Sequence, residues 1–199
     1  MNATLKMLFE SDRADHAIPK VAGTPMYVEM RNKDTQRRRE VQSILCNETD
    51  FEATDYYHAA WILNHGDTID EAELAFRLAK KSIELGYPHG RWLYAAAFDR
   101  WLMYSGLPQK FGTQVVPDGQ RYRLWDYDVN TTDEERAQFN VSPISELLRR
   151  AERDSREIAQ PPIGEAPQWL RHAMKRWEHQ EMAEPSDGRK SPVGRDFES

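Results

Sequence analysis

The segment from His89 to Ser105 constrains the fold more than any other part of the sequence. Its apolar residues fall on every side of a helical wheel: Trp92, Leu93, Tyr94, Ala95, Ala96, Ala97, Phe98, Trp101, Leu102, Met103 and Tyr104. A helix that is apolar all round is normally surrounded by protein. The chain is therefore expected to wrap further helices around this one, which ends before Gly106 and Pro108.

Helical periodicity recurs along the rest of the chain. It predicts helices over residues 2–16, 54–65, 68–85 and 167–181, and others that begin near residues 34, 132 and 142. Thr54 and Thr68 are the expected N-caps of two of them, and Glu71 completes a capping box with Thr68. These segments predict a compact multi-helix bundle.

The second of these helices is predicted to begin near Asp34, an acceptable N-cap residue. It carries three consecutive arginines, Arg37, Arg38 and Arg39, on the face that is expected to be exposed. A short basic run of this kind is typical of a solvated helix face whose charges pair with nearby acids.

The segment from 111 to 125 lacks helical periodicity. Two short runs, 111–116 and 121–125, flank Pro117-Asp118-Gly119, which is a typical turn sequence. A small β-hairpin or an ordered loop is predicted there. The expected fold class is therefore mainly α, with this hairpin or loop near residues 111–125 as its one non-helical feature.

Composition divides the chain into three parts. A helical domain is predicted over 1–160, a linker plus an accessory amphipathic helix over 161–182, and a disordered tail over 183–199, where Pro, Ser, Asp, Gly and charged residues dominate.

Two related stretches, 57–60 and 94–97, lie 37 residues apart. This spacing resembles that of the helical hairpins in tetratricopeptide and Sel1-like proteins, although two copies are too few for an array.

Charge and cysteine content narrow the possible partners and compartment. The chain has 33 acidic and 27 basic residues, a net charge of −6, which disfavours sequence-independent nucleic-acid binding. Its single cysteine, Cys46, excludes an internal disulfide and a thiolate zinc site and fits a reducing compartment. No apolar stretch approaches the roughly 18 residues of a membrane span. A cytoplasmic protein without membrane or nucleic-acid partners is expected.

An ionic pair, Asp99-Arg100, interrupts the most apolar helix. Neighbouring helix positions differ by about 100° in direction, so the two charges are expected to face different partners. Gln109, Thr113 and Gln114 follow just beyond this helix and supply polar groups. Two interpretations remain open: these residues satisfy each other and lock the bundle, or they line a small ligand pocket.

Two histidines, His58 and His65, lie seven residues apart on one predicted helix face, which separates them by about 10.5 Å along the axis. One metal ion cannot bind both directly. Either imidazole could act as a general acid or base, although a lone helix histidine is more often structural. Phosphate-loop, zinc-protease, nucleophile-elbow and dinucleotide motifs are absent from the sequence, so neither a metal nor a cofactor is predicted.

Several of these motifs together resemble a bacterial family defined by a domain of unknown function. The resemblance covers roughly residues 5–150 and rests on His65-Gly66, Asp99-Arg100 and the segment from Gln109 to Gln114, which fit an H-G … D-R … Q-x-[YF]-G-T-Q pattern. Segments 11–15 and 34–38 are similar to the N-terminal part of that family. One departure is Asn64, where the family has glutamine. The resemblance implies that the signature side chains converge in space, but it implies no activity.

Three hypotheses for function follow. In the first, the protein is a binding or scaffold module whose small polar pocket binds an unknown small polar or anionic ligand, or a protein partner, through Arg100, Gln109, Thr113 and Gln114. In the second, it is a metal-independent hydrolase or transferase that uses His65 or His58 with Asp99. In the third, these polar residues only hold the bundle together.

Overall fold

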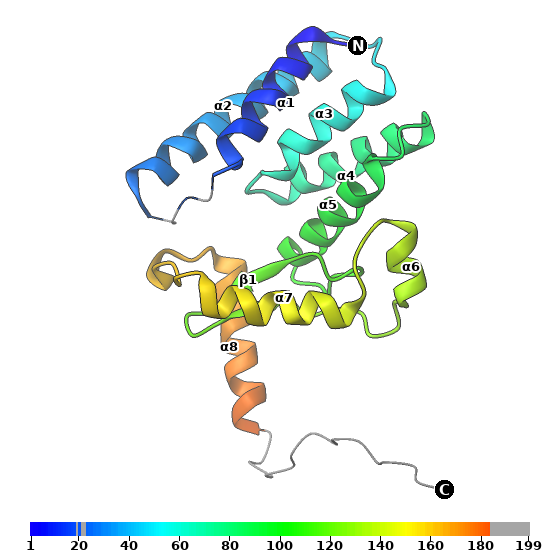
Figure 1. The fold of residues 1–199 in the computed structure, drawn as a ribbon. Coiled ribbons are helices and arrows are strands. Elements are labelled where there is room, and N and C mark those ends of the chain that lie inside the picture. Colours follow the sequence, from blue (N-terminus) through cyan, green and yellow to red (C-terminus); the bar gives the residue numbers. More distant parts are fainter. Residues whose placement is uncertain (19, 21–22, 184–199) are drawn as a thin grey trace, which may run out of the picture.

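The structure, a computed structural model, describes residues 1–18, 20 and 23–183. Helices dominate the described residues, as predicted, and two short strands form the only sheet among them. In chain order the helices are α1 (Ala3–His16), α2 (Pro25–Asn47), α3 (Ala53–Asn64), α4 (Ile69–Glu84), α5 (Gly90–Tyr104), α6 (Asp133–Gln138), α7 (Ile144–Glu157) and α8 (Gln168–Ala183), with a short 3-10 turn over Ile163–Glu165. Figure 1 shows α1 and α2 side by side at one end of the molecule and α8 at the other.

The first core lies between α1, α3, α4 and α5. Small residues such as Ala60, Ala75 and Ala97 are fully buried there and let the helices approach closely, while Leu5 and Ile62 fill the space between them. The most extensive packing among the described elements is that of α4 against α3 and against α5. The prediction that protein surrounds α5 is confirmed for most of the helix, which α3, α4 and the C-terminal segments cover, but not for its start, where Trp92 is 40% exposed.

The predicted hairpin is present. Strands β1 (Val115–Pro117) and β2 (Tyr122–Leu124) pair antiparallel, with Val116 opposite Arg123. The carboxylate of Asp118 accepts hydrogen bonds from the backbone amides of residues 120 and 121, which closes the turn. α7 packs against β2. The hairpin thus lies between α7 and the end of α5 (Figure 1).

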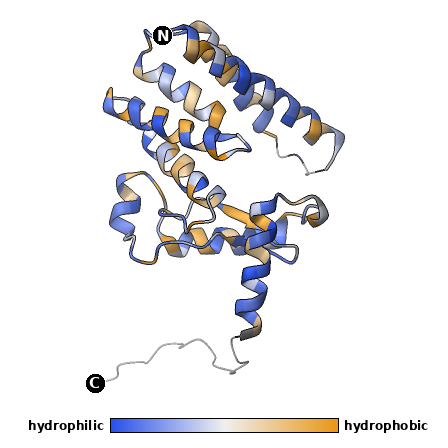
Figure 2. Ribbon diagram, turned by 180° about the vertical axis from the view of Figure 1, so that it is seen from behind, coloured by the Kyte–Doolittle hydropathy of each residue, from blue (hydrophilic) through white to orange (hydrophobic). Residues whose placement is uncertain are grey.

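A second core joins the hairpin to α8. Trp125 and Trp177 are buried there with ring centroids 5.3 Å apart, and Met103 at the end of α5 packs against the same cluster. The indole Nε1 of Trp177 donates a hydrogen bond of 2.8 Å to Asp126. In Figure 2 the β1 ribbon is strongly hydrophobic, whereas α2 is mostly hydrophilic along its length. α5 reaches both cores and connects the two ends of the molecule.

Two helix starts differ from the prediction. α2 begins at Pro25 rather than near Asp34, because Thr24 accepts a hydrogen bond from the backbone amide of Tyr27 and proline suits the first helical position. α3 begins at Ala53, and its N-cap is Glu52 rather than Thr54. In both cases the chain enters the helix earlier than the apolar pattern begins.

The expected exposure of the arginine run was also wrong. Arg37 and Arg38 are buried, and only Arg39 is exposed. The guanidinium of Arg37 pairs with Asp12 of α1, and that of Arg38 pairs with Glu71 in the first turn of α4. Pairing with nearby acids was predicted correctly, but the pairs lie inside the protein.

None of the helices in the described part of the chain is long and apolar enough to cross a bilayer. Most of the tail predicted to be disordered, residues 184–199, lies outside the described residues.

Candidate functional site

Asp99 contacts the loop formed by residues 109–114, as predicted. Its Oδ1 accepts hydrogen bonds from the backbone amides of Lys110, at 2.8 Å, and Phe111, at 2.9 Å. Its Oδ2 accepts two more from Thr113, from the backbone amide at 2.9 Å and from the hydroxyl at 2.8 Å. Burial raises the pKa of Asp99, and the donated hydrogen bonds oppose that rise. All four partners are donors, so the carboxylate serves as the anchor of this loop.

The two glutamines of the signature are also engaged inside the protein. Gln109 is fully buried; its Nε2 donates to the carbonyl oxygens of Gln114 and Trp125, and its Oε1 accepts from the backbone amide of Gln114. Gln114 donates from Nε2 to the carbonyl oxygen of Ala96. These hydrogen bonds are all made within the protein and need no ligand. Ligand binding by Gln109, Thr113 and Gln114 therefore stays a prediction.

His58 lies in an aromatic cluster rather than beside Asp99. Its ring stacks on Phe9 with centroids 4.4 Å apart, and its Nδ1 is buried without a hydrogen-bond partner among the described residues. Burial lowers the pKa of His58, which therefore favours the neutral form. An apolar packing role accounts for these contacts.

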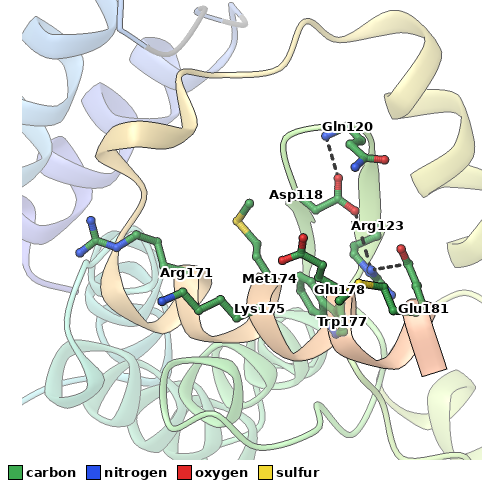
Figure 3. Close-up of a pocket in the computed structure, with 10 residues that line it drawn as sticks. Asp118, Gln120, Arg123, Arg171, Met174, Lys175, Trp177, Glu178 and Glu181 are labelled. Carbon is green, nitrogen blue, oxygen red and sulfur yellow. Dashed lines mark hydrogen bonds and ion pairs between the residues drawn. The ribbon is translucent and has the colours of Figure 1, made fainter.

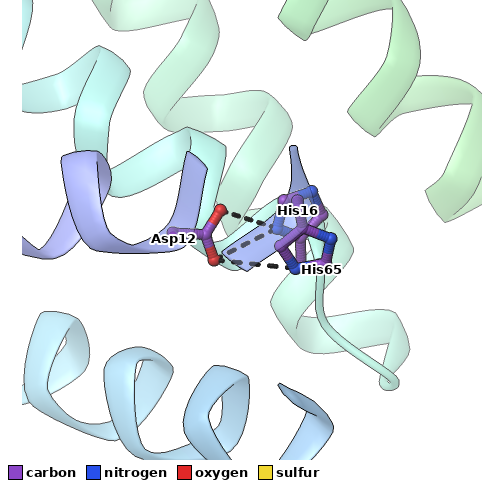
Figure 4. Close-up of side chains that lie close together, drawn as sticks. All are labelled: Asp12, His16 and His65. Carbon is purple, nitrogen blue, oxygen red and sulfur yellow. Dashed lines mark hydrogen bonds and ion pairs between the residues drawn. The ribbon is translucent and has the colours of Figure 1, made fainter. Parts of the chain in front are cut away.

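His65 instead meets a group of acidic and basic residues from α1 and α2. Its Nδ1 lies 3.0 Å from Oδ2 of Asp12, whose side chain is wholly buried (Figure 4). The same carboxylate accepts a hydrogen bond of 3.0 Å from the indole Nε1 of Trp61, and Nε of Arg37 lies 3.3 Å from its Oδ1. Asp12 is thus held in place with both oxygens near Nδ1 of His65, Oδ2 at 3.0 Å and Oδ1 at 3.3 Å.

A second histidine, His16, completes the cluster. Its Nε2 lies 3.1 Å from Oδ1 of Asp34, another wholly buried carboxylate. The rings of His16 and His65 stack face to face, with centroids 4.1 Å apart and planes inclined by 25° (Figure 4). Their side chains are 26% and 19% exposed, so solvent reaches both rings. We call Asp12, His16, Asp34 and His65 the histidine cluster.

Three arginines of α2 hold this cluster together. Arg37 bridges α1 and α2, with Nη1 2.7 Å from Asp15 and Nη2 2.6 Å from Asp34. Arg31 and Arg38 both donate to the backbone carbonyl of His65, at 3.0 and 3.2 Å. The position of the His65 backbone is therefore fixed from two sides.

The turn after His65 is equally constrained. A Cβ at Gly66 would lie 2.8 Å from the carbonyl oxygen of Leu63 and 2.6 Å from Cβ of Glu71, so only glycine fits. Glu71 in turn accepts a hydrogen bond of 2.7 Å from Nε of Arg38. The turn presents His65 at the end of α3 in one orientation.

Burial and charge set the protonation of the cluster. Burial lowers the pKa of His65; the hydrogen bond to Asp12 and its charge oppose this, and electrostatic repulsion by His16 and then by Arg100 adds to it. Burial acts to raise the pKa of Asp34, but hydrogen bonds from His16 and Arg37 outweigh it and hold that pKa well below its usual range. The cluster therefore combines a neutral His65 with an anionic Asp34.

Of the four residues predicted to bind a ligand, Arg100 is the one whose charge acts on this cluster. It lies on α5, is partly buried, and its Nε is buried without a hydrogen-bond partner in the described part of the chain. The prediction that Asp99 and Arg100 face different partners holds for Asp99 alone, because Arg100 has no hydrogen-bond or ion-pair partner among the described residues. Asp99 anchors the loop, whereas Arg100 acts on His65.

The residues best placed to hold a metal ion are Asp12, His16 and His65, whose ligand atoms lie within 4.8 Å of one another. A metal–nitrogen bond of about 2.1 Å lies in the plane of its imidazole ring. Rings that stack at 4.1 Å with a 25° inclination direct their lone pairs side by side rather than to one point. Coordination by both histidines would require one ring to rotate, so this arrangement does not fit a resident metal.

The cavities of about 310–640 Å³ in the described part of the chain are lined by residues outside the histidine cluster. One of about 540 Å³ lies between the hairpin and α8, where the guanidinium of Arg123 lies 4.1 Å from the ring centroid of Trp177 (Figure 3). Arg123 also pairs with Asp118 and Glu181. The arginine of this cavity is thus already neutralised by its neighbours, in contrast to Arg100.

Comparison with known proteins adds no assignment. No family model, curated protein or solved structure matches this chain. The resemblance described from the sequence therefore stays a prediction.

Sequence reasoning missed Asp12, His16 and Asp34 as site residues. Asp12 and His16 are four residues apart, which is the spacing that places two side chains on one helix face. That signal was present, but their partner His65 lies 53 residues from Asp12 along the chain. The packing of α1 against α3 was needed to bring them together.

Lowering the pH is expected to destabilise the fold through its buried histidines. His65 and His58 have pKa values below 6.5, so below that pH the unfolded chain binds more protons than the folded one. Their stabilising contribution is complete above pH 6.5 and is lost as the pH falls towards the folded pKa values. Urea unfolding at about pH 7.5 and about pH 5.5 measures this change.

The matched variants are His65→Gln and the exposed His172→Gln. The first should flatten the loss of stability on acidification, and the second should leave it unchanged. If the free energy of unfolding falls equally on acidification in the wild type and in His65→Gln, the lowered pKa of His65 is contradicted.

Proposed function

We propose that the protein is an acid–base enzyme, a hydrolase or transferase, in which His65 is the general base and Asp12 positions it. This replaces Asp99 by Asp12 in the catalytic pair expected from the sequence. The observation that carries the proposal is the contact of 3.0 Å between Nδ1 of His65 and the wholly buried Asp12 carboxylate. A partly exposed imidazole oriented by a buried carboxylate is the arrangement that general-base catalysis requires.

The chemistry follows from the hydrogen bond. Because the carboxylate of Asp12 can only accept, Nδ1 of His65 carries the proton and Nε2 keeps its lone pair. Nε2 has no hydrogen-bond partner among the described residues, so it is available to take a proton from water or from a substrate hydroxyl. The imidazolium that forms is stabilised by Asp12 and returns the proton to the leaving group.

His65 is a better candidate than His16 for this role. The carboxylate beside His16, Asp34, is already shared with Arg31 and Arg37, at 2.8 and 2.6 Å. Its charge is therefore less available to stabilise an imidazolium. Asp12 receives a neutral indole N–H and only the more distant Nε of Arg37.

Substitution of His65 by glutamine is expected to reduce turnover by about 10²- to 10⁴-fold, the range typical of a lost general base. The assay is hydrolysis of a panel of chromogenic carboxylate esters, phosphate monoesters and phosphate diesters. Turnover by the wild-type protein should decline as acid protonates His65, and it should survive chelation of metal ions.

His58→Gln and His172→Gln are the controls, because the first tests the other candidate histidine and the second an exposed one. Both should keep wild-type turnover. Wild-type protein that turns over no member of the panel, or His65→Gln that retains full turnover, would contradict the proposal.

A binding module is the second candidate, favoured by Arg100, whose guanidinium has no ion-pair partner among the described residues. The ligand would then be a small polar or anionic molecule, and His65 would contact it without transferring a proton. A cytoplasmic location fits either function, since the lone Cys46 is an exposed free thiol, which persists in a reducing compartment.

A further inference from the structure

Arg100 differs from the other arginines around the histidine cluster. Arg31, Arg37 and Arg38 each pair with two or more acidic side chains. Arg100 forms no ion pair or hydrogen bond with any described residue, although its Nε is buried. A guanidinium that has lost water at Nε without gaining a partner is destabilising in the free protein.

The packing of α5 directs the face that carries Arg100 towards the turn that follows His65. Tyr104 lies one helical turn after Arg100, on the same face of α5, and its hydroxyl donates a hydrogen bond of 3.0 Å to the carbonyl oxygen of Gly66. This contact holds that face against the turn that carries His65. The effect of Arg100 on the pKa of His65 agrees with this placement.

The neighbouring acids do not neutralise Arg100. Asp12 is occupied by His65, Trp61 and Arg37, and Asp34 by His16, Arg31 and Arg37. The two Nη groups of Arg100, which are neither buried nor paired with a described residue, are therefore available to a ligand, whereas its Nε is buried. A planar guanidinium fork matches the oxygens of a carboxylate or a phosphate, and such charge-assisted pairs are about twice as strong as neutral hydrogen bonds.

We infer that Arg100 binds an oxyanion, either a phosphate or a carboxylate group, next to the imidazole of His65. If the proposed function is also correct, this group belongs to the substrate and lies beside the bond that His65 acts on. The oxyanion site itself needs no catalysis, so the two conclusions can be tested separately.

Anion binding should change the basicity of His65. An anion on Arg100 cancels the positive charge that disfavours the imidazolium, so the pKa of His65 should rise when the anion binds. Linkage makes the effect reciprocal, and the anion should bind more tightly as His65 becomes protonated. A purely structural arginine would not produce this coupling.

The experiment is an NMR titration of the histidine side chains with inorganic phosphate, and separately with acetate, at constant ionic strength set by chloride. The wild-type protein should show saturable shifts at His65, with a raised pKa in the presence of the preferred anion. The phosphate and acetate arms identify which oxyanion the site prefers.

Three variants complete the design. Arg100→Gln should weaken binding at least tenfold, as expected for loss of a charge-assisted pair, and should raise the pKa of His65 in the absence of anion. Arg100→Lys should retain part of the binding. Arg39→Gln, which alters an exposed arginine of α2, should bind as the wild type does.

The outcomes separate the two proposals. The absence of saturable shifts with both anions, or unchanged binding in Arg100→Gln that folds as the wild type does, overturns the oxyanion site. Binding that is lost in Arg100→Gln but retained in His65→Gln supports the site even where no turnover is found. Turnover that depends on His65 but not on Arg100 would support the proposed function and would show that the oxyanion site takes no part in it.

Discussion

Replacing Asp99 with alanine is expected to destabilise the protein by about 3–5 kcal/mol, because each buried donor left without an acceptor costs about 1–3 kcal/mol. The carboxylate accepts four hydrogen bonds from the segment between Lys110 and Thr113. Water can reach Lys110 and Thr113, which are partly buried, but it cannot reach the amide of Phe111. Urea unfolding monitored by tryptophan fluorescence measures the change.

The control for this variant is Asp70→Ala, which removes an exposed carboxylate from the first turn of α4. It should cost less than about 1 kcal/mol, the size of a helix-dipole interaction. Asp99→Asn keeps the shape but turns an amide N–H₂ towards donors, so it should be destabilised as well. If Asp99→Ala unfolds at the same urea concentration as Asp70→Ala, Asp99 does not anchor the loop.

Replacing Asp12 with alanine is the second large effect, expected at about 3 kcal/mol. The indole N–H of Trp61 and Nδ1 of His65 both lose their acceptor, whereas Arg37 keeps Asp15 and Asp34. The loss is therefore smaller than for a buried ion pair that is broken completely.

Asp15→Ala is the matched control, since Asp15 lies on the same helix and contacts the same arginine but is 25% exposed. It should cost about 1 kcal/mol or less. A double-mutant cycle between Asp12→Ala and His65→Gln isolates their interaction, expected at about 1.5–3 kcal/mol for a hydrogen bond to a charged group. A coupling near zero would show that the two residues do not act together.

Local sequence patterns predicted the helices and the hairpin well. The apolar run in α5 and the turn at Pro117-Asp118-Gly119 each depend on residues that are close together in the sequence. The structure confirms the helix and the hairpin that they predict. The contact of Asp99 with Thr113 could also be predicted, because only 14 residues separate the two positions. Short loops leave few ways to satisfy a buried charge.

The histidine cluster could not be predicted in the same way. It joins α1 to the end of α3 and to α2, and each of these segments contributes one or two polar residues that look ordinary in isolation. The burial of Arg37 and Arg38 was missed for the same reason, since it depends on which helix covers α2. Such pairings are fixed by packing over more than 20 residues of separation.

The consecutive placement of Asp99 and Arg100 has a mechanical consequence. Four hydrogen bonds fasten one side of α5 to the 110–113 loop, so the helix cannot roll about its long axis without breaking them. The backbone of Arg100 is consequently held in place, and with it the direction in which its side chain leaves the helix. For an anion that binds as proposed, the helix then needs no reordering, and only the freedom of the Arg100 side chain remains to be lost.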